Sequence, residues 1–237
     1  MVIKTRTGRV ITDKYESVED AVKAGVNLWN ANLSGVNLSH VDLTNANLAE
    51  ADLTNTNLSC AFLTGATLSE ANLTNTNLSC AVLTKANLTH ANLSGANLSE
   101  ADLSDANVTD ATLTGATLSE ANLTNANLRG ATLLNVNLSD ADLRDAVLTN
   151  ANLTNANLSN AILTGTNLTD ANLTRANLRD ANLRWADLVE ANLTDANLQD
   201  TELNEADLSR AIFTNADLTS VNISGAHIQL GNKFIRL

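Results

Sequence analysis

The sequence predicts an all-β solenoid, in which one short unit repeats along a common axis. Three observations lead to this prediction. An apolar residue recurs every five positions from Leu28 to Ile228, and 37 of these 41 centres are Leu. Ala stands two residues before 32 of the centres. Asn or Asp precedes 30 centres and Ser or Thr follows 30, and residues of these types favour turns.

A period of five residues fits neither an α-helix nor a plain strand, whose periods are about 3.6 and 2. Within each unit the two apolar residues are two apart, so they point to the same side of an extended segment. The chain must then turn once in each unit to bring every Leu to one axis. The Ala positions are small because several segments crowd around that axis. Successive coils would stack about 4.8 Å apart.

The unit resembles that of the pentapeptide-repeat family, as in residues 31–35 (Ala-Asn-Leu-Ser-Gly) and 121–125 (Ala-Asn-Leu-Thr-Asn). The resemblance extends over residues 26–230. It implies a right-handed quadrilateral β-helix with twenty residues in each coil, and hence about ten coils in this chain. Residues twenty apart are therefore expected to stack in columns.

The chain divides into three predicted parts. Residues 1–25 form an N-terminal cap, residues 26–230 form the β-helix, and residues 231–237 form a C-terminal cap or tail. A solenoid needs caps, because the apolar core of its last coil otherwise meets water.

The N-terminal cap is expected to hold a hairpin and a short helix. Residues 2–15 have the pattern of a β-hairpin with its turn at Gly8. Ser17 followed by Asp20 matches an acidic variant of the helix capping box. Gly25 is a suitable residue to end the helix.

The C-terminal tail leaves the five-residue register and contains Phe234, Ile235 and Leu237. These residues could fold back over the last coil. Alternatively, they could contact a second copy of the chain and form an end-to-end homodimer.

Charge is unevenly distributed, although the whole chain has a formal net charge of −12. Residues 26–230 contain 22 acidic and seven basic residues. Many of the acids fall into two columns, which the implied coil places on opposite faces: Glu50, Glu70, Asp110, Asp170 and Glu190, and Glu100, Glu120, Asp140, Asp180 and Asp200. Some family members that protect topoisomerases are thought to imitate DNA with such acidic faces. A surface of Asn, Ser and Thr also needs net charge simply to remain dispersed.

One wall of the implied β-helix carries the best candidate contact patch. Aromatic residues and Arg are enriched at protein interfaces. The patch consists of apolar residues in one column, where Asn or Asp is normal, and of neighbours on the same face: Phe62, Val82 and Ile162, with Lys85, Arg144, Arg184 and Trp185. The alternative is that these are scattered surface residues, which are common.

Catalytic and cofactor chemistry is not expected. His40, Cys60 and Cys80 share a column, but a straight row of ligands does not converge on a metal ion. A Cys60–Cys80 disulfide is sterically possible, although a reducing cytosol disfavours it. No nucleotide-binding fingerprint is present, and we expect no metal, no cofactor and no enzymatic activity.

The sequence therefore favours a bacterial, cytoplasmic structural or protein-interaction module that presents a rigid acidic rod to a protein partner. The alternative is a DNA mimic that binds a DNA-handling enzyme such as a type II topoisomerase. Direct binding of nucleic acid is not expected, because the rod is acidic and poor in aromatic residues. Membrane insertion is not expected either, because no run of about 18 apolar residues exists.

Overall fold

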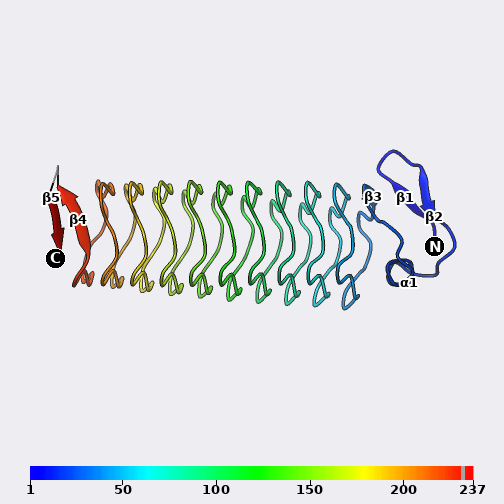
Figure 1. Ribbon diagram of the computed structural model, residues 1–237, viewed down its shortest axis with the longest axis horizontal. Coiled ribbons are helices and arrows are strands. Elements are labelled where there is room, and N and C mark those ends of the chain that lie inside the picture. Colours follow the sequence, from blue (N-terminus) through cyan, green and yellow to red (C-terminus); the bar gives the residue numbers. More distant parts are fainter. Residues whose placement is uncertain (231–232, 237) are drawn as a thin grey trace.

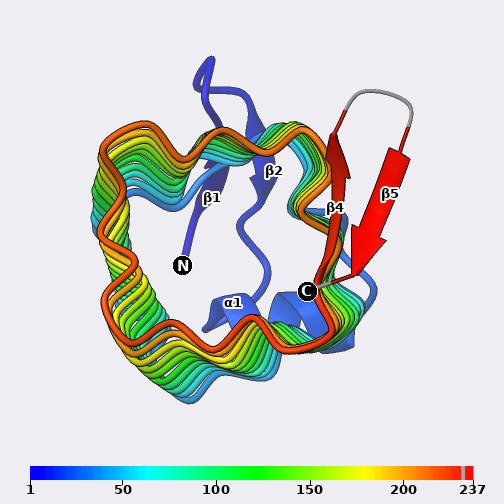
Figure 2. The same ribbon diagram turned by 90° about the vertical axis from the view of Figure 1, so that its left-hand side faces the viewer.

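The leucine repeat winds the chain into a long tower of four-sided coils (Figures 1 and 2). The structure is a computed structural model that describes residues 1–230 and 233–236. Parallel bridges join residues twenty apart, beginning with Asn32 and Asp52 and continuing to Asp207 and His227. The coil of twenty residues is thereby confirmed.

The core of the tower is a filled column of leucine. Every repeat centre from Leu28 to Leu208 is buried. Four of the small positions beside them hold Thr instead of Ala, and these hydroxyls are buried as well. Each donates a hydrogen bond of 2.7–2.9 Å to a main-chain carbonyl of the preceding coil, in the pairs Thr56–Leu33, Thr76–Leu53, Thr166–Leu143 and Thr201–Leu178. A buried hydroxyl is thus accommodated because it has an acceptor.

Main-chain hydrogen bonds join each coil to both of its neighbours. In the unit centred on Leu123, the amide of Leu123 donates to the carbonyl of Asp142 in the next coil at 2.7 Å. The amide of Asn122 donates to the carbonyl of Ala101 in the preceding coil at 2.9 Å. Because the same pattern recurs along the tower, each coil depends on the coils directly above and below it.

Turns within each coil satisfy the remaining amides. The side-chain oxygen of Asn122 accepts a hydrogen bond from the amide of Thr124 at 3.1 Å, and the amide of Ala126 donates to the carbonyl of Leu123 at 2.9 Å. The corner residue between them, Asn125, has a positive φ of 58°. Every fifth residue adopts this left-handed conformation, including Glu, Arg and Trp. This geometry explains why the Asn or Asp before each centre is so frequent, since it forms the turn.

The N-terminal cap contains the expected hairpin and helix. Strands β1 (Ile3–Thr5), β2 (Val10–Thr12) and β3 (Ala31–Asn32) form a sheet in the order β2-β1-β3, so that β1 pairs with the first coil. Helix α1 (Val18–Lys23) lies inside the outline of the coils when they are viewed down the tower (Figure 2).

Ser17 begins α1, as the sequence predicted. Its hydroxyl oxygen accepts a hydrogen bond from the amide of Asp20 at 3.0 Å. Val18 and Ala21 are buried on the face that covers the end of the core. Within the described residues, no helix combines the length and the apolar character needed to cross a bilayer.

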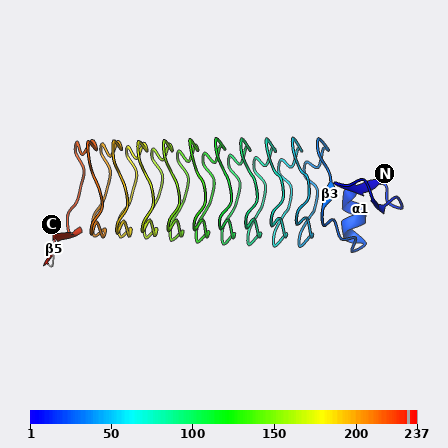
Figure 3. The same cartoon turned by 90° about the horizontal axis from the view of Figure 1, so that it is seen from above.

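The other end of the tower is a hairpin at one edge. Strand β4 (His227–Leu230) continues from the last coil and pairs antiparallel with β5 (Lys233–Arg236). Viewed down the tower, β5 lies outside the square outline, and Figure 3 shows the hairpin to one side at the tower's end. Leu218 remains 50% exposed and Ile223 remains 38% exposed, so the hairpin does not cover the last coil.

Candidate functional site

The predicted contact patch lies on one face, which we call the patch wall: residues 42–45 and the four-residue segments at every twentieth position after them, to 222–225, each of which ends in a corner residue such as Lys85 or Trp185. Phe62 and Val82 are neighbours in its column and form a parallel bridge. Ile162 belongs to the same column, between Asp142 and Asn182. The structure therefore places the three apolar residues in one file.

The patch is nevertheless two separate groups. Ile162 lies five coils beyond Phe62, a distance of roughly 24 Å at the usual spacing of stacked strands. Phe62, Val82 and Lys85 form the first group. The second group contains Ile162, Arg144, Arg184 and Trp185, and spans three successive coils. This separation follows from the twenty-residue coil and its expected rise, although the seven residues were predicted as one patch.

Apolar residues in this column omit a local hydrogen bond. In most units an Asn or Asp oxygen accepts from the amide two residues later, as Asp142 does from Arg144 at 3.1 Å. Phe62 and Ile162 have no side-chain oxygen to do this. Phe62 is 49% exposed, so core packing does not compensate for the loss. A position that breaks a local rule without gain in packing is a candidate for function.

Trp185 is the most prominent member of the second group. It occupies a left-handed corner with φ 58° and is 57% exposed. The guanidinium of Arg184 lies over its ring, 4.8 Å from the ring centroid. This is the geometry of a cation–π pair, which holds both side chains on the surface in a fixed arrangement.

Arg144 already forms an ion pair within the chain. Its guanidinium forms an ion pair with Asp142 at 2.6 Å, with a second hydrogen bond from Nε at 2.9 Å. These hydrogen bonds hold the pKa of Asp142 below its usual value, and Asp142 in turn raises the pKa of Arg144. A contact at this patch would therefore rely first on Trp185, Arg184 and Ile162.

The column of His40, Cys60 and Cys80 does not converge. Both cysteines are free thiols. The thiol of Cys80 lies 3.8 Å from the carboxylate of Glu100. Its pKa is raised, first because the thiol is partly withdrawn from water and then because of the negative charge of Glu100. In the part of the chain that the structure describes, no three His, Cys, Asp or Glu side chains gather where they could hold a metal ion.

The acidic columns differ along their length. Towards the C-terminal end, arginines pair with them: Arg179 lies 3.1 Å from Asp180, and Arg210 lies 2.6 Å from Glu190. Towards the N-terminal end, residues 26–128 contain nine acids and one base, Lys85. The acidic surface is therefore least neutralised in the first half of the tower.

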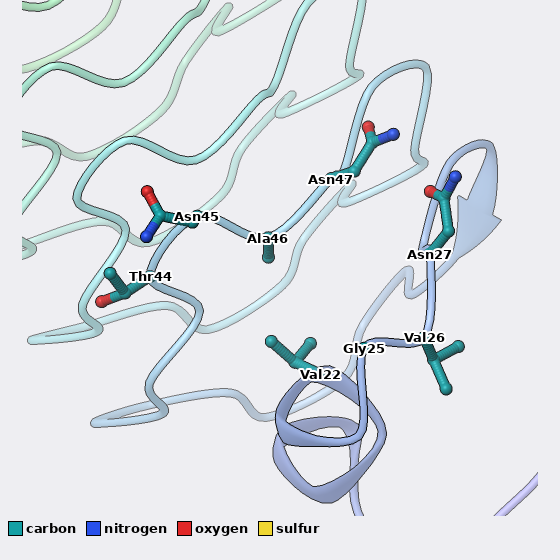
Figure 4. A pocket seen from close by; sticks show the side chains of 8 residues that line it. All are labelled: Val22, Gly25, Val26, Asn27, Thr44, Asn45, Ala46 and Asn47. Carbon is teal, nitrogen blue, oxygen red and sulfur yellow. The ribbon is translucent and has the colours of Figure 1, made fainter.

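A cavity of about 440 Å³ lies between α1 and the second coil, which the sequence did not indicate (Figure 4). It forms where residues 26–28 do not pair with residues 46–48, although the other walls are bridged. Val22 from α1 and Ala46 from the second coil face each other there. None of the eight lining residues is ionisable: Val22, Gly25, Val26, Asn27, Thr44, Asn45, Ala46 and Asn47. The cavity has no side chain suited to acid–base chemistry.

The two ends add features of different kinds. At the N-terminal end, Trp29 stands where most units have Ser or Thr, and sequence reasoning overlooked it. At the C-terminal end, an apolar hollow of about 130 Å³ is lined by the last core residues: Leu203, Leu208, Phe213, Leu218, Ile223 and Ile228. Of the predicted end contacts, Phe234 and Ile235 fall on β5, and Leu237 lies outside the described residues.

These features define a class of protein: a rigid, repeat-built β-solenoid whose convex walls and two ends are its available surfaces. The pentapeptide-repeat family model matches in eight copies, over residues 24–59, 46–79, 81–120, 111–150, 151–189 and 191–229. The chain belongs to the pentapeptide-repeat family, and its fold is the right-handed β-helix of that family. Such proteins are structural or interaction modules and are generally not enzymes.

Solved structures agree with this assignment. The chain is 33% identical to HetL, a pentapeptide-repeat protein involved in heterocyst differentiation regulation from the cyanobacterium Nostoc sp. strain PCC 7120. That match covers 91% of this chain and 97% of HetL, with a TM-score of 0.49. QnrB1, a plasmid-mediated fluoroquinolone resistance protein, is 19% identical over 71% of this chain and 91% of its own, with a TM-score of 0.54. No curated protein sequence matches this chain.

Proposed function

We propose that this chain is a non-enzymatic scaffold that presents a rigid acidic rod and binds a protein partner through the patch wall around Trp185. The observation that carries the proposal is the exposed ring of Trp185 with Arg184 stacked on it. Trp and Arg are the residues most often found at the energetic centre of interfaces. Because the β-helix fixes the main chain beneath them, little conformational entropy is lost on binding.

Restoring the repeat at this patch is the direct test. Trp185→Asn and Arg184→Thr introduce residues that other units carry at the same positions, so the fold should be retained. Crosslinking to protein partners in host extract should lose the same specific product in both variants. Ile212→Asn, which restores the repeat at an exposed position on the opposite wall, is the matched control and should keep that product. Equal products from all variants would exclude the patch.

A homodimer through the open C-terminal end is a second proposal. The apolar hollow beside Leu218 and Ile223 is the kind of surface that a second copy could cover. Light scattering after gel filtration should give twice the monomer mass for the full chain, and Leu218→Asp should return it to a monomer. A monomer at all concentrations would remove this proposal while leaving the patch wall unaffected.

A DNA mimic is the alternative function, and the two acidic columns at opposite corners of the coil favour it. The arginines that pair with these columns near Asp180 and Glu190 weaken it in the C-terminal half. A supercoiling assay with a type II topoisomerase distinguishes the alternatives, because a scaffold should leave the reaction unchanged. We place either function in the bacterial cytoplasm, where neighbouring thiols such as Cys60 and Cys80 stay reduced.

A further inference from the structure

A narrow groove lies between the N-terminal hairpin and the first coil, away from the patch wall. We call it the cap groove. It has a volume of about 190 Å³. Strands β1 and β2 form one side, and the first coil forms the other. Its lining residues are Thr5, Arg9, Val10, Ile11, Asn27 and Trp29.

Pairing of the hairpin with the tower creates this groove. Lys4 pairs with Asn32 and Thr5 pairs with Ala31, so the hairpin is fixed at the edge of the first coil. Trp29 lies two residues before the paired segment. Main-chain pairing therefore fixes the hairpin side of the groove, whereas on the other side the amide of Trp29 bonds to the side-chain oxygen of Asn27.

Trp29 is held in place but only partly covered. Its indole Nε1 donates a hydrogen bond to a carboxylate oxygen of Glu50 at 3.2 Å, and its amide donates to the side-chain oxygen of Asn27 at 2.9 Å. Even so, 45% of the residue is exposed, and so is 49% of Val10 across the groove. Two exposed apolar side chains therefore line the groove. One of them, Trp29, occupies a repeat position that usually holds Ser or Thr.

The hairpin side of the groove has a charge opposite to that of the tower. Residues 1–12 contain Lys4, Arg6 and Arg9 and no acidic residue. None of these three bases takes part in an ion pair among the described residues. Arg6 instead donates to the main-chain carbonyl of Glu50 at 3.5 Å. Arg9 therefore lines the groove beside Val10, Ile11 and Trp29, and the hairpin that carries it has two further bases. The carboxylate of Glu50, which accepts from the indole of Trp29, is the acid beside the groove.

We propose that the cap groove binds a short acidic segment of a partner protein, which inserts one apolar side chain between Trp29 and Val10 while its carboxylates contact Arg9 and its basic neighbours. The groove is smaller than the roughly 300–1,000 Å³ of usual small-molecule sites, so it suits a single side chain. Charge complementarity selects an acidic segment.

A second copy of this chain is a poorer occupant. Residues 231–237 carry two bases and no acid, so the two ends of the tower have charge of the same sign. The acids of the tower stand on rigid walls rather than on a segment that could enter a narrow groove. The proposal concerns a surface separate from the patch wall, so either site can fail without the other.

The full-length Trp185→Asn variant makes the test direct, because it leaves Trp29 as the sole tryptophan. The probe is a short synthetic peptide of Glu, Asp and Ser with one central Leu. Two further peptides replace either the acids with Lys or the Leu with Ser. We expect the acidic peptide to shift the emission of Trp29 saturably, and each of the other two to bind at least about tenfold more weakly.

Variants of the groove complete the experiment. In fluorescence anisotropy with a labelled peptide, Trp29→Thr and Arg9→Glu should each weaken binding by about tenfold or more. Thr is common at the Trp29 position of other units, and Arg9 is on the surface, so neither variant should unfold the chain. Lys85→Glu, a change of the same charge on the patch wall, should leave the affinity unchanged.

Several outcomes would overturn the proposal. These are no saturable binding of the acidic peptide up to about 1 mM, equal affinity for the Lys peptide, or unchanged affinity in both groove variants. Binding of duplex DNA or anionic vesicles in place of the peptide would contradict it as well. So would a self-association, seen by light scattering, that Trp29→Thr abolishes.

Discussion

The two ends of the tower have the same kind of apolar core, but the core residues are buried at one end and partly exposed to water at the other. At the N-terminal end Leu28 and Leu33 are buried, because α1 places Val18 and Ala21 over them. At the C-terminal end Leu218 is half exposed, because β5 lies to one side of the last coil. A half-exposed Leu gives up about 1 kcal/mol of the stabilisation that full burial provides. The repeat thus builds each coil, whereas an end is covered only where the sequence departs from the repeat.

The largest expected effect distinguishes the middle of the tower from its open end. Leu123 is completely buried, so Leu123→Asp should lower the free energy of unfolding by about 5 kcal/mol or more. Leu218→Asp should lower it by only about 1–2 kcal/mol, since half of that side chain already meets water. Urea unfolding followed by circular dichroism measures both. Asn125→Asp, on an exposed corner, is the control and should be nearly silent. Similar losses at Leu123 and Leu218 would contradict the comparison.

The cap itself is the next test. Ala21 is fully buried where α1 meets the core, so Ala21→Asp should cost about 3 kcal/mol and expose the first coil. Hydrogen exchange should then become faster in the first coil, until it resembles the last one. Ala24→Asn, at the exposed end of the same helix, should change neither quantity. Unchanged exchange in Ala21→Asp would show that α1 does not protect this end.

Buried Thr hydroxyls near the two ends test the same difference in stability between the covered and the open end, with smaller expected effects. Thr56→Val keeps the side-chain shape but removes the donor to the carbonyl of Leu33, and should cost about 1 kcal/mol. Thr201→Val removes the equivalent bond to Leu178 beside the open end. Its cost in thermal unfolding should be smaller, because we expect the last coils, whose core residues Leu218 and Ile223 are partly exposed, to open before the rest of the tower. A larger loss of stability for Thr201→Val than for Thr56→Val would contradict the expectation that the last coils open first.

The smallest expected effect concerns pH. Asp42 and Asp217 occupy equivalent turns near the two ends, and each pKa is lowered, first by a hydrogen bond from the hydroxyl two residues later and then by its amide. A folded pKa below the unfolded value means that the stabilisation is present above the unfolded pKa and is lost as pH falls through the folded one. Asp42→Asn and Asp217→Asn should each remove part of the acid sensitivity of unfolding. Carboxylate NMR titrations should show the lower pKa at Asp42, if the open end is the looser one.

Much of the fold follows from the sequence because one local rule repeats. The spacing of Leu28, Leu33 and their successors predicted a buried axis, and Ser17 predicted where α1 begins. The left-handed corners were not predicted, because those positions hold Glu, Arg and Cys as well as Asn and Gly. Their conformation is imposed by stacking between coils, which no single unit encodes.

The candidate sites were less predictable than the fold. The column of Phe62, Val82 and Ile162 lies on one wall, as expected from the twenty-residue coil, but the prediction joined into one patch residues that five coils separate. The cap groove was missed because it requires β1 to pair with β3, a contact between distant segments. The only sequence signal was Trp29 in a position that usually holds Ser or Thr.

The strict coil of twenty residues has a consequence for how such a protein can change. Residues 64–75 recur identically at 114–125, an offset of two and a half coils, so the copies face opposite directions. Inserting five residues would turn everything beyond the insertion by a quarter circle, whereas inserting twenty would only move it about 4.8 Å further along. The length of the tower and the direction that a given wall faces can therefore be changed separately, in whole units, without altering the residues at either end.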